Sequence, residues 1–484
     1  MEELTLLKEN GTEVSSGVYD VIGIGIGPFN LGLAALLDGT SELDALFLEQ
    51  KEQFSWHEGM LVDGATLQVP FMADLVTMID PTSPFSYLNY LKEQGRLYSF
   101  YFFEQFHIPR KEYNHYCQWA AGKLPSCKFG MTVTSVSLIQ GDGASVYEVT
   151  VEEAGSGTTV RYLAKELVLG VGTVPQVRDD LRSGLSETMF HSSSYMKRSG
   201  GCKEASSITV VGSGQSAAEI FYDLLKSQPE RGYELTWITR SRGFFPMEYS
   251  KLGLEHFSPD YTSYFYSLPP EKKDGVLEEQ HLLYKGISAA TIAQIYDELY
   301  HQTACGGQPR VNLLSLAEVK EITLVEGGSR LAGEEVEGGG SEERSAKERS
   351  AKESSTNAGS GKRFELSCLQ WEQEKGFRHE SEVVILATGY KHKVPGFVDG
   401  IRHLVHWDGH GRYEVNADYS LRMNGEAGTK NRIYVQNGEL HTHGVGAPDL
   451  GLGAHRNAVI LNGLLKEERY PVRERNVFQR FGAP

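Results

Sequence analysis

Two glycine-rich turns, nearly 190 residues apart, constrain the fold of this chain more than any other feature. Residues 23–28 read GIGIGP and residues 212–217 read GSGQSA, and each turn follows an apolar run and opens a helix-like one. Glycine lets the backbone turn tightly and approach a pyrophosphate, and the N-terminus of the next helix presents free N–H groups to it. Two such turns predict two dinucleotides, a combination typical of flavin redox chemistry.

The first turn has the strand–turn–helix context that a dinucleotide site requires. The β-branched run 19–24 predicts a buried strand, and the apolar run 30–37 predicts a helix. The next strand, 46–48, ends in an acidic residue at about the spacing where a carboxylate accepts hydrogen bonds from a ribose hydroxyl. A glycine-rich turn that binds nothing is the alternative. We predict FAD at this site, held by Gly23, Gly25, Gly27, Asn30 and Glu49.

The second turn lies between a predicted strand at 207–211 and a predicted helix at 217–225. The strand that follows, 235–238, ends in Thr-Arg-Ser-Arg in place of an acid. Arginine at that edge suits the 2′-phosphate of NADPH through charge-assisted hydrogen bonds, although Arg240 and Arg242 also fit ordinary solvated loop charges. We predict NADPH here, held by Gly212, Gly214, Gln215, Ser216 and Arg240.

Composition narrows the class of protein. With 484 residues the chain exceeds one typical core, so two or three domains are expected. A formal net charge of −17 disfavours nucleic acid and anionic membranes as partners and favours a cationic substrate. The five cysteines form no CxxC pair, the N-terminus lacks a signal segment, and no apolar stretch approaches the roughly 20 residues that span a bilayer. These features predict a cytoplasmic protein.

The motifs predict an α/β fold of two nested Rossmann-like dinucleotide-binding domains with a smaller helical substrate-binding region. We expect a polar tail at 1–17, the first part of the FAD-binding domain at 18–201, the NADPH-binding domain at 202–382, and the return of the FAD-binding domain with a substrate-binding segment at 383–484. Residues 325–362 are rich in Gly, Glu, Ser and Lys, a composition that predicts a disordered surface insertion.

Six motifs are spread over nearly the whole chain: 23–31 (GIGIGPFNL), 54–57 (FSWH), 67–71 (LQVPF), 80–91 (DPTSPFSYLNYL), 211–219 (VGSGQSAAE) and 387–390 (ATGY). Together they resemble the flavin-dependent N-hydroxylating monooxygenases of the lysine and ornithine N-monooxygenase type, which serve siderophore biosynthesis. The resemblance implies that NADPH reduces FAD, that the reduced flavin takes up O₂, and that one oxygen atom passes to a primary amine. Because the amine must be neutral, its site should lower the amine pKa or accept its proton. A homo-oligomer, often a tetramer, is implied as well.

By this resemblance Gln68 is the catalytic residue, since it matches a glutamine whose uncharged amide hydrogen-bonds near the reactive edge of the flavin. Trp56 and His57 match residues that flank the flavin ring, although an isolated Trp-His pair more often packs in a core. Because His441 and His443 have no acidic or cysteine partners nearby, no metal is predicted. Further cofactor contacts are expected from Pro28, Thr388, Gly389, Leu450 and Gly451.

Two departures from the amino-acid hydroxylases of the family predict the substrate. Ala73 stands where those enzymes have a lysine that pairs with the substrate carboxylate, and Leu254 stands where they usually have a carboxylate-contacting asparagine. Apolar replacements select against a carboxylate, because burying one without a cation or donors is costly. We therefore expect a diamine such as putrescine, cadaverine or diaminopropane, with Asp74, Glu248 or Glu255 accepting its far ammonium.

Four alternatives compete with this prediction. A lysine side-chain N-hydroxylase of the same family would need another cation for the carboxylate, for example Lys251 or Lys285. Another class B flavin monooxygenase, of the Baeyer–Villiger or sulfide-oxidising kind, is suggested by residues 190–195, which resemble part of a linker in those enzymes. A disulfide reductase would need a CxxxxC pair, which is missing. A non-enzymatic flavin-binding protein would show no NADPH oxidation.

Overall fold

The computed structural model describes residues 7–9, 12–140, 145–325, 362–425 and 430–483. The predicted insertion at 325–362 therefore lies outside the described residues apart from its two end positions, and the predicted tail lies partly outside them. Within the described part, no helix combines the length and the apolar character needed to cross a membrane.

An eight-stranded sheet forms the base of the first part of the molecule, in the order β4-β3-β2-β7-β6-β5, with β1 paired to β2 and β18 paired to β7. Strands β2, β3, β4, β7 and β18 pair in parallel, whereas β1, β5 and β6 pair antiparallel. Because β18 comes from the C-terminal region, both ends of the described chain contribute to this sheet. The bounds are β1 (Leu7–Glu9), β2 (Thr12–Ile24), β3 (Ala45–Glu49), β4 (Cys127–Phe129), β5 (Met131–Gln140), β6 (Ser145–Glu153), β7 (Thr159–Leu169) and β18 (Ile433–Val435).

Helices α1 (Pro28–Leu37), α4 (Arg110–Lys123) and α15 (Gly453–Leu465) pack together in this part of the molecule. Every residue of α1 except Phe29 is buried, because the helix is covered by its neighbours as well as by the sheet. This apolar run is the one that predicts a helix from the sequence. Strand β2 begins at Thr12, so residues 12–17 form strand where a polar tail was predicted.

A five-stranded parallel sheet forms the base of the second part, in the order β12-β11-β10-β16-β9. Helices α7 (Gln215–Arg231) and α12 (Ala289–Thr303) pack on each other, and an antiparallel sheet of three strands lies next to the parallel one. The bounds are β9 (Met189–His191), β10 (Ser207–Val211), β11 (Glu234–Ile238), β12 (Val311–Leu314), β13 (Ala317–Val325), β14 (Arg363–Gln370), β15 (Lys375–Ser381) and β16 (Val383–Leu386).

Strand β16 corrects one predicted boundary. We expected the chain to return to the first domain at residue 383, but β16 pairs with β10 and β9 in the second sheet, with Val210 opposite Ile385. All four residues of β16 are buried, as in the centre of any parallel sheet, so their apolar pattern does not reveal which sheet they join. The return to the first sheet takes place after this strand.

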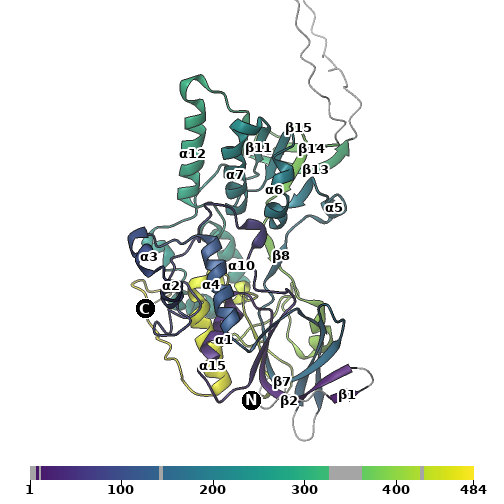
Figure 1. Cartoon of the computed structure of the whole chain (residues 1–484), viewed down its shortest axis with the longest axis vertical. Coiled ribbons are helices and arrows are strands. Elements are labelled where there is room, and N and C mark those ends of the chain that lie inside the picture. The colour runs from purple at the N-terminus through teal and green to yellow at the C-terminus, as the bar shows by residue number, and fades with distance from the viewer. Residues whose placement is uncertain (1–6, 10–11, 141–144, 326–361, 426–429, 484) are drawn as a thin grey trace, which may run out of the picture.

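Two short strands connect the parts: β8 (Thr173–Pro175) pairs antiparallel with β17 (Tyr390–His392). Figure 1 shows β8 between the sheet with α1, α4 and α15 and the sheet with α7 and α12. The other α-helices of the described part are α2 (Tyr87–Glu93), α3 (Leu97–Phe103), α5 (Asp179–Arg182), α6 (Tyr195–Cys202), α8 (Lys251–Leu254), α9 (Pro259–Ser267), α10 (Pro270–Glu279), α11 (His281–Tyr284) and α14 (Leu440–His443). Helices α9 and α10 pack on α14. The predicted α/β fold with two nested dinucleotide-type domains and a smaller helical region is confirmed.

Candidate active site

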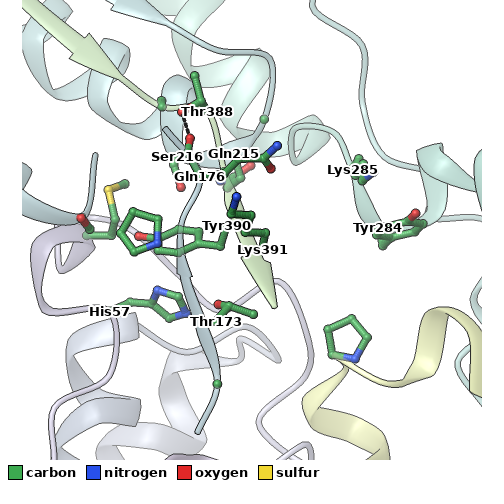
Figure 2. A pocket seen from close by; sticks show the side chains of 18 of the residues that line it. His57, Thr173, Gln176, Gln215, Ser216, Tyr284, Lys285, Thr388, Tyr390 and Lys391 are labelled. Atoms are coloured by element: carbon green, nitrogen blue, oxygen red, sulfur yellow. Dashed lines mark hydrogen bonds between the residues drawn. The ribbon is translucent and has the colours of Figure 1, made fainter. Parts of the chain in front are cut away.

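A cavity of about 4440 Å³ lies between the two parts, lined by both glycine turns, both connecting strands and the helical region. Pockets for one small ligand measure roughly 300–1,000 Å³, so this cavity has room for two dinucleotides and a substrate. Lys and Arg outnumber Asp and Glu along its wall, although the whole chain is acidic. Figure 2 shows part of the wall, with Tyr390 of β17 between His57 and Ser216 in this view.

The first glycine turn leaves space at the start of α1. Gly25 has φ +87°, and a Cβ added to it would lie 2.6 Å from the carbonyl oxygen of Gly170. A Cβ added to Gly27 would have no atom of the protein within 4 Å, so this residue faces open space in the cavity. Pro28 is the first residue of the helix, and the backbone N–H of Ile26 donates to Glu49 Oε2 at 2.8 Å. This arrangement fits a pyrophosphate at the helix N-terminus, as FAD requires.

Two residues predicted to hold FAD do not line the cavity. Asn30 is fully buried, and its amide donates to the carbonyl oxygen of Gly25 at 2.7 Å and accepts from Gln436 Nε2 at 2.7 Å. It therefore fixes the turn from below. Gly23 lies inside β2, where a Cβ would be 2.2 Å from the ring of Phe47, so glycine is needed there for packing. Both residues match the dinucleotide motif through structural roles: Gly23 allows the packing of the strand before the turn, and Asn30 holds the turn itself.

The predicted flavin-edge residues all line the cavity. The Nε2 atom of Gln68 is buried and has no hydrogen-bond partner in the described part of the chain. The ring of Trp56 packs edge-on against the rings of His57 and Tyr113, with centroid distances of 4.8 Å and 5.2 Å. The ring centroids of His57 and Tyr390 are 5.5 Å apart. Enclosure by the protein lowers the pKa of His57 to about 4, so its ring is neutral near pH 7. An unpaired amide donor and a neutral aromatic wall in one cavity fit a flavin ring.

The second glycine turn is also open. A Cβ added to Gly214 would find only the carbonyl oxygen of Gly286, at 3.9 Å, whereas one added to Gly212 would lie 2.2 Å from the carbonyl oxygen of Ala387. Ser216 lines the cavity, as does Arg240, which is exposed at the end of β11. These positions fit NADPH.

Other side chains near this turn are already engaged. The amide of Gln215 donates to Glu219 Oε1 at 2.9 Å and accepts from the N–H of Ser288 at 2.7 Å, although the residue lines the cavity. Arg242 pairs with Glu372 at 2.7 Å. Arg240 is therefore the better candidate of the two arginines for a 2′-phosphate.

A buried ion pair that the sequence did not reveal links the two parts. Arg110 of α4 donates from both terminal nitrogens to the carboxylate of Glu219 in α7, each at 2.8 Å. Both side chains are largely buried, and Arg110 also donates to the carbonyl oxygen of Met60 at 3.0 Å. Glu219 lies one helical turn after Gln215, so the pair holds the second glycine turn in place against the first part of the molecule.

The predicted substrate positions divide into two groups. Ala73 and Leu254 line the cavity. Asp74 is outside its wall, and its buried carboxylate accepts hydrogen bonds from the N–H groups of Val76, Thr77 and Tyr87 and from the hydroxyl of Thr77.

Glu255 is also outside the wall, and its carboxylate accepts from the N–H groups of Phe478 and Gln479. The carboxylate of Glu248 accepts a hydrogen bond from the N–H of Ser250, and Glu248 does not line the cavity. Neighbouring residues of the chain already donate to all three carboxylates, which makes them weaker candidates for the far ammonium; their acceptor roles stay predictions.

The remaining predicted cofactor contacts come from two segments of the chain, one between β16 and β17 and one after α14. Thr388, Gly389, Leu450 and Gly451 all line the wall, and the hydroxyl of Thr388 donates to the carbonyl oxygen of Gln176. Asp449, which directly precedes Leu450, also lines the wall and was not predicted as a site residue. Its position beside Leu450 and Gly451 in the sequence was the available signal.

Fold and site together define a flavin- and nicotinamide-dependent oxidoreductase. A family profile described as L-lysine 6-monooxygenase/L-ornithine 5-monooxygenase matches residues 17–348. A putrescine N-hydroxylase from Shewanella oneidensis is 43% identical over 97% of this chain and 85% of its own length. The chain belongs to the L-lysine 6-monooxygenase/L-ornithine 5-monooxygenase family.

Two solved structures extend the comparison to the cofactors. DfoA from Erwinia amylovora, a cadaverine monooxygenase bound to FAD, superposes with a TM-score of 0.85 at 41% identity, over 97% of this chain and 99% of that one. The ornithine N-hydroxylase KtzI from Kutzneria, with reduced FAD, NADP⁺ and L-ornithine, superposes with a TM-score of 0.78 at 26% identity, over 93% and 99%. The predicted enzyme class and its FAD and NADPH cofactors are confirmed; the roles of individual site residues stay predictions.

Proposed function

We propose that this enzyme N-hydroxylates one amine of an aliphatic diamine such as putrescine, cadaverine or diaminopropane, using FAD, NADPH and O₂, for hydroxamate siderophore biosynthesis. The observation that carries the substrate class is the apolar character of the two positions expected to anchor a carboxylate. Ala73 and Leu254 both line the cavity, and neither side chain can donate a hydrogen bond. The relatives named for putrescine and cadaverine support the same substrate class.

Bound FAD, once reduced, supplies the activation of O₂ for transfer of one oxygen atom to the amine. Around it, this chain provides an amide donor at Gln68 Nε2, whose buried position has no competing acceptor in the described part of the protein. The neutral ring of His57 and the indole of Trp56 line the same cavity without adding charge. A site of this kind favours the neutral amine, because a low-dielectric wall disfavours the ammonium form.

The second candidate function is lysine side-chain N-hydroxylation. Lys251 and Lys285 both line the cavity, so a cation is present that a substrate carboxylate could meet. Figure 2 shows Lys285 beside Tyr284, on the other side of the view from His57, and its Nζ lies 5.2 Å from the Tyr284 ring centroid.

The experiment that separates the two functions measures hydroxylamine product and NADPH oxidation in parallel, for diamines, lysine and ornithine. We expect product from diamines alone. Product from lysine that is lost in a Lys285→Met or Lys251→Met variant would establish the second function in place of the first. Gln68→Ala, with FAD content retained, is expected to lower the yield of hydroxylamine per NADPH consumed.

Assembly and location belong to the same proposal. We propose a homo-oligomer, a tetramer by family resemblance, that works in the cytoplasm. Three aromatic side chains of α3, Tyr98, Tyr101 and Phe102, are 81%, 71% and 75% exposed, and exposed apolar patches mark interaction surfaces. Light scattering should show a smaller mass for Phe102→Asp than for the wild type; an unchanged mass would refute this interface. The unpaired state of the four cysteines that the structure describes is consistent with a reducing compartment.

The division of the chain into functional domains also remains a proposal. The membership of β18 in the first sheet and of β16 in the second supports an NADPH-binding domain inserted into a FAD-binding domain. Its boundaries then fall in the two connecting strands, near residues 173–175 and 390–392.

A further inference from the structure

Asp449 is a carboxylate on the cavity wall that the site described above leaves without a role. It directly precedes the short 3₁₀ helix Leu450–Leu452. A Cβ added to Gly451 would lie 2.8 Å from Asp449 Oδ1 and 3.9 Å from the Cβ of Ala73. The carboxylate and Ala73 therefore flank the same glycine, at the end of the cavity where the substrate was predicted to bind.

Each of the other acidic side chains on the cavity wall is already satisfied. Glu49 accepts backbone N–H groups. The others form ion pairs: Glu58 with Lys197, Asp63 with Lys111, Asp179 with Arg182, Glu187 with Arg198, Glu219 with Arg110, and Glu318 with Lys320. No ion pair is formed by Asp449 with any residue in the described ranges. Asp449 and Glu49 are thus the two carboxylates on this wall without a cation in the described ranges, and Glu49 lies at the first glycine turn, where FAD is predicted.

The surroundings of Asp449 favour the binding of a cation. Burial raises its pKa to about 6, and the N–H groups of Gly451 and Leu452 oppose that rise by favouring the charged form. Arg456, whose charge acts on Asp449, already has other partners: its Nη1 lies 3.0 Å from Glu439 Oε1, and its Nη2 donates to the carbonyl oxygen of Ala447 at 2.6 Å. That second bond fixes the backbone just before the Asp449 segment.

We propose that the Asp449 carboxylate binds the far ammonium of the diamine, the amine that is not hydroxylated. This inference rests on the proposed function. The charge of Asp449 also explains how the site would discriminate diamines from amino acids. A lysine or ornithine molecule bound in the same direction would bring its own carboxylate toward Asp449, and two carboxylates in an enclosed site repel each other. Ala73 contributes by leaving space and no competing cation beside Asp449.

The test compares putrescine with 1-butylamine, which has the same carbon chain and lacks the far ammonium. In Asp449→Asn, kcat/KM for putrescine should fall roughly ten- to a hundredfold, mainly through KM, because a charge-assisted contact is lost. Activity on butylamine should change little, so the preference for the diamine collapses. Asp449→Glu keeps the charge and should retain part of that preference. Asp297→Asn, at an exposed position of α12 outside the cavity, is the matched control and should behave as the wild type.

Flavin content and melting temperature report whether each variant is folded. Should Asp449→Asn fail to fold, Asp449→Ser tests the same contact, because serine also removes the negative charge; it should raise KM for putrescine and not for butylamine. Wild-type preference in folded Asp449→Asn, or an equal loss with both amines, would overturn the inference. A wild-type enzyme that hydroxylates no diamine at all would instead overturn the proposed function.

Discussion

Gly27→Ala separates the needs of the fold from the needs of the cofactor. Gly27 has φ −86° and ψ 179°, which alanine adopts without strain, and its added Cβ would meet no protein atom within 4 Å. The methyl group would instead occupy the open space at the N-terminus of α1, where we predict the pyrophosphate of FAD. The variant should therefore fold normally and bind FAD poorly.

The magnitude follows from these contacts. Gly27 is the N-cap of α1, where replacing glycine by alanine costs less than about 1 kcal/mol of stability. Losing one hydrogen bond to a charged phosphate costs about 1.5–3 kcal/mol, which is roughly a 10- to 150-fold rise in the Kd of FAD. Gly25→Ala should differ, because φ +87° adds about 1–2 kcal/mol of strain, and the Cβ would also lie 2.6 Å from the Gly170 oxygen.

The assay measures the unfolding free energy of flavin-free protein and the Kd of FAD by fluorescence quenching. Gly214→Ala is the matched control at the second turn: it should keep wild-type FAD affinity and raise the KM of NADPH, because its Cβ also meets open space. Tight FAD binding by folded Gly27→Ala would refute the assignment of the first turn. A large loss of stability in flavin-free Gly27→Ala would show that its glycine serves the fold.

Three further predictions follow from the site. Arg240→Ala should raise the KM of NADPH about 10- to 100-fold and leave the KM of NADH unchanged. Arg242→Ala should have little effect on either KM, because the charge of Arg242 pairs with Glu372. Equal effects of Arg240→Ala on both coenzymes would contradict its role at the 2′-phosphate. Glu219→Gln leaves Arg110 buried without its partner and should cost about 3–5 kcal/mol in urea unfolding, more than the double variant Arg110→Met/Glu219→Leu; equal stabilities would refute this. Burial lowers the pKa of His443 from 6.5 to about 3 in the folded protein. As the pH falls, the imidazole is therefore protonated in the unfolded chain before it is protonated in the folded one. Stability should drop by about 1.4 kcal/mol per pH unit from this group between about pH 6.5 and 3, and His443→Asn should reduce the slope of ΔG against pH by that amount.

Local elements could be predicted well from the sequence. The strand expected at 207–211 is β10 with the same bounds, because its apolar, β-branched run is decisive on its own. The helix expected from residue 30 begins at Pro28, since proline is favoured in the first position of a helix and the apolar pattern starts later. Both glycine turns line the cavity as their motifs predict, and Gln68 and Ala73, which were assigned through the family resemblance, lie on the same wall.

What a side chain contacts could not be predicted, because it depends on how the folded backbone places its neighbours, whether these are near or distant in the sequence. Asn30 lies in the turn motif, yet its amide is used by Gly25 and Gln436, which are far apart in the chain. Asp74 has the right charge for an ammonium, but Tyr87 and Thr77 occupy it. Asp449 stood out only once the structure showed which acids on the wall already have partners.

The most direct test of the central claim is the reaction of the FAD-loaded enzyme with putrescine and NADPH under ¹⁸O₂, followed by mass spectrometry of the product. We predict a hydroxylamine that carries one ¹⁸O atom on one nitrogen, formed with consumption of NADPH. NADPH consumption that yields only hydrogen peroxide, with putrescine unchanged, would contradict the claim that this cavity hydroxylates a diamine.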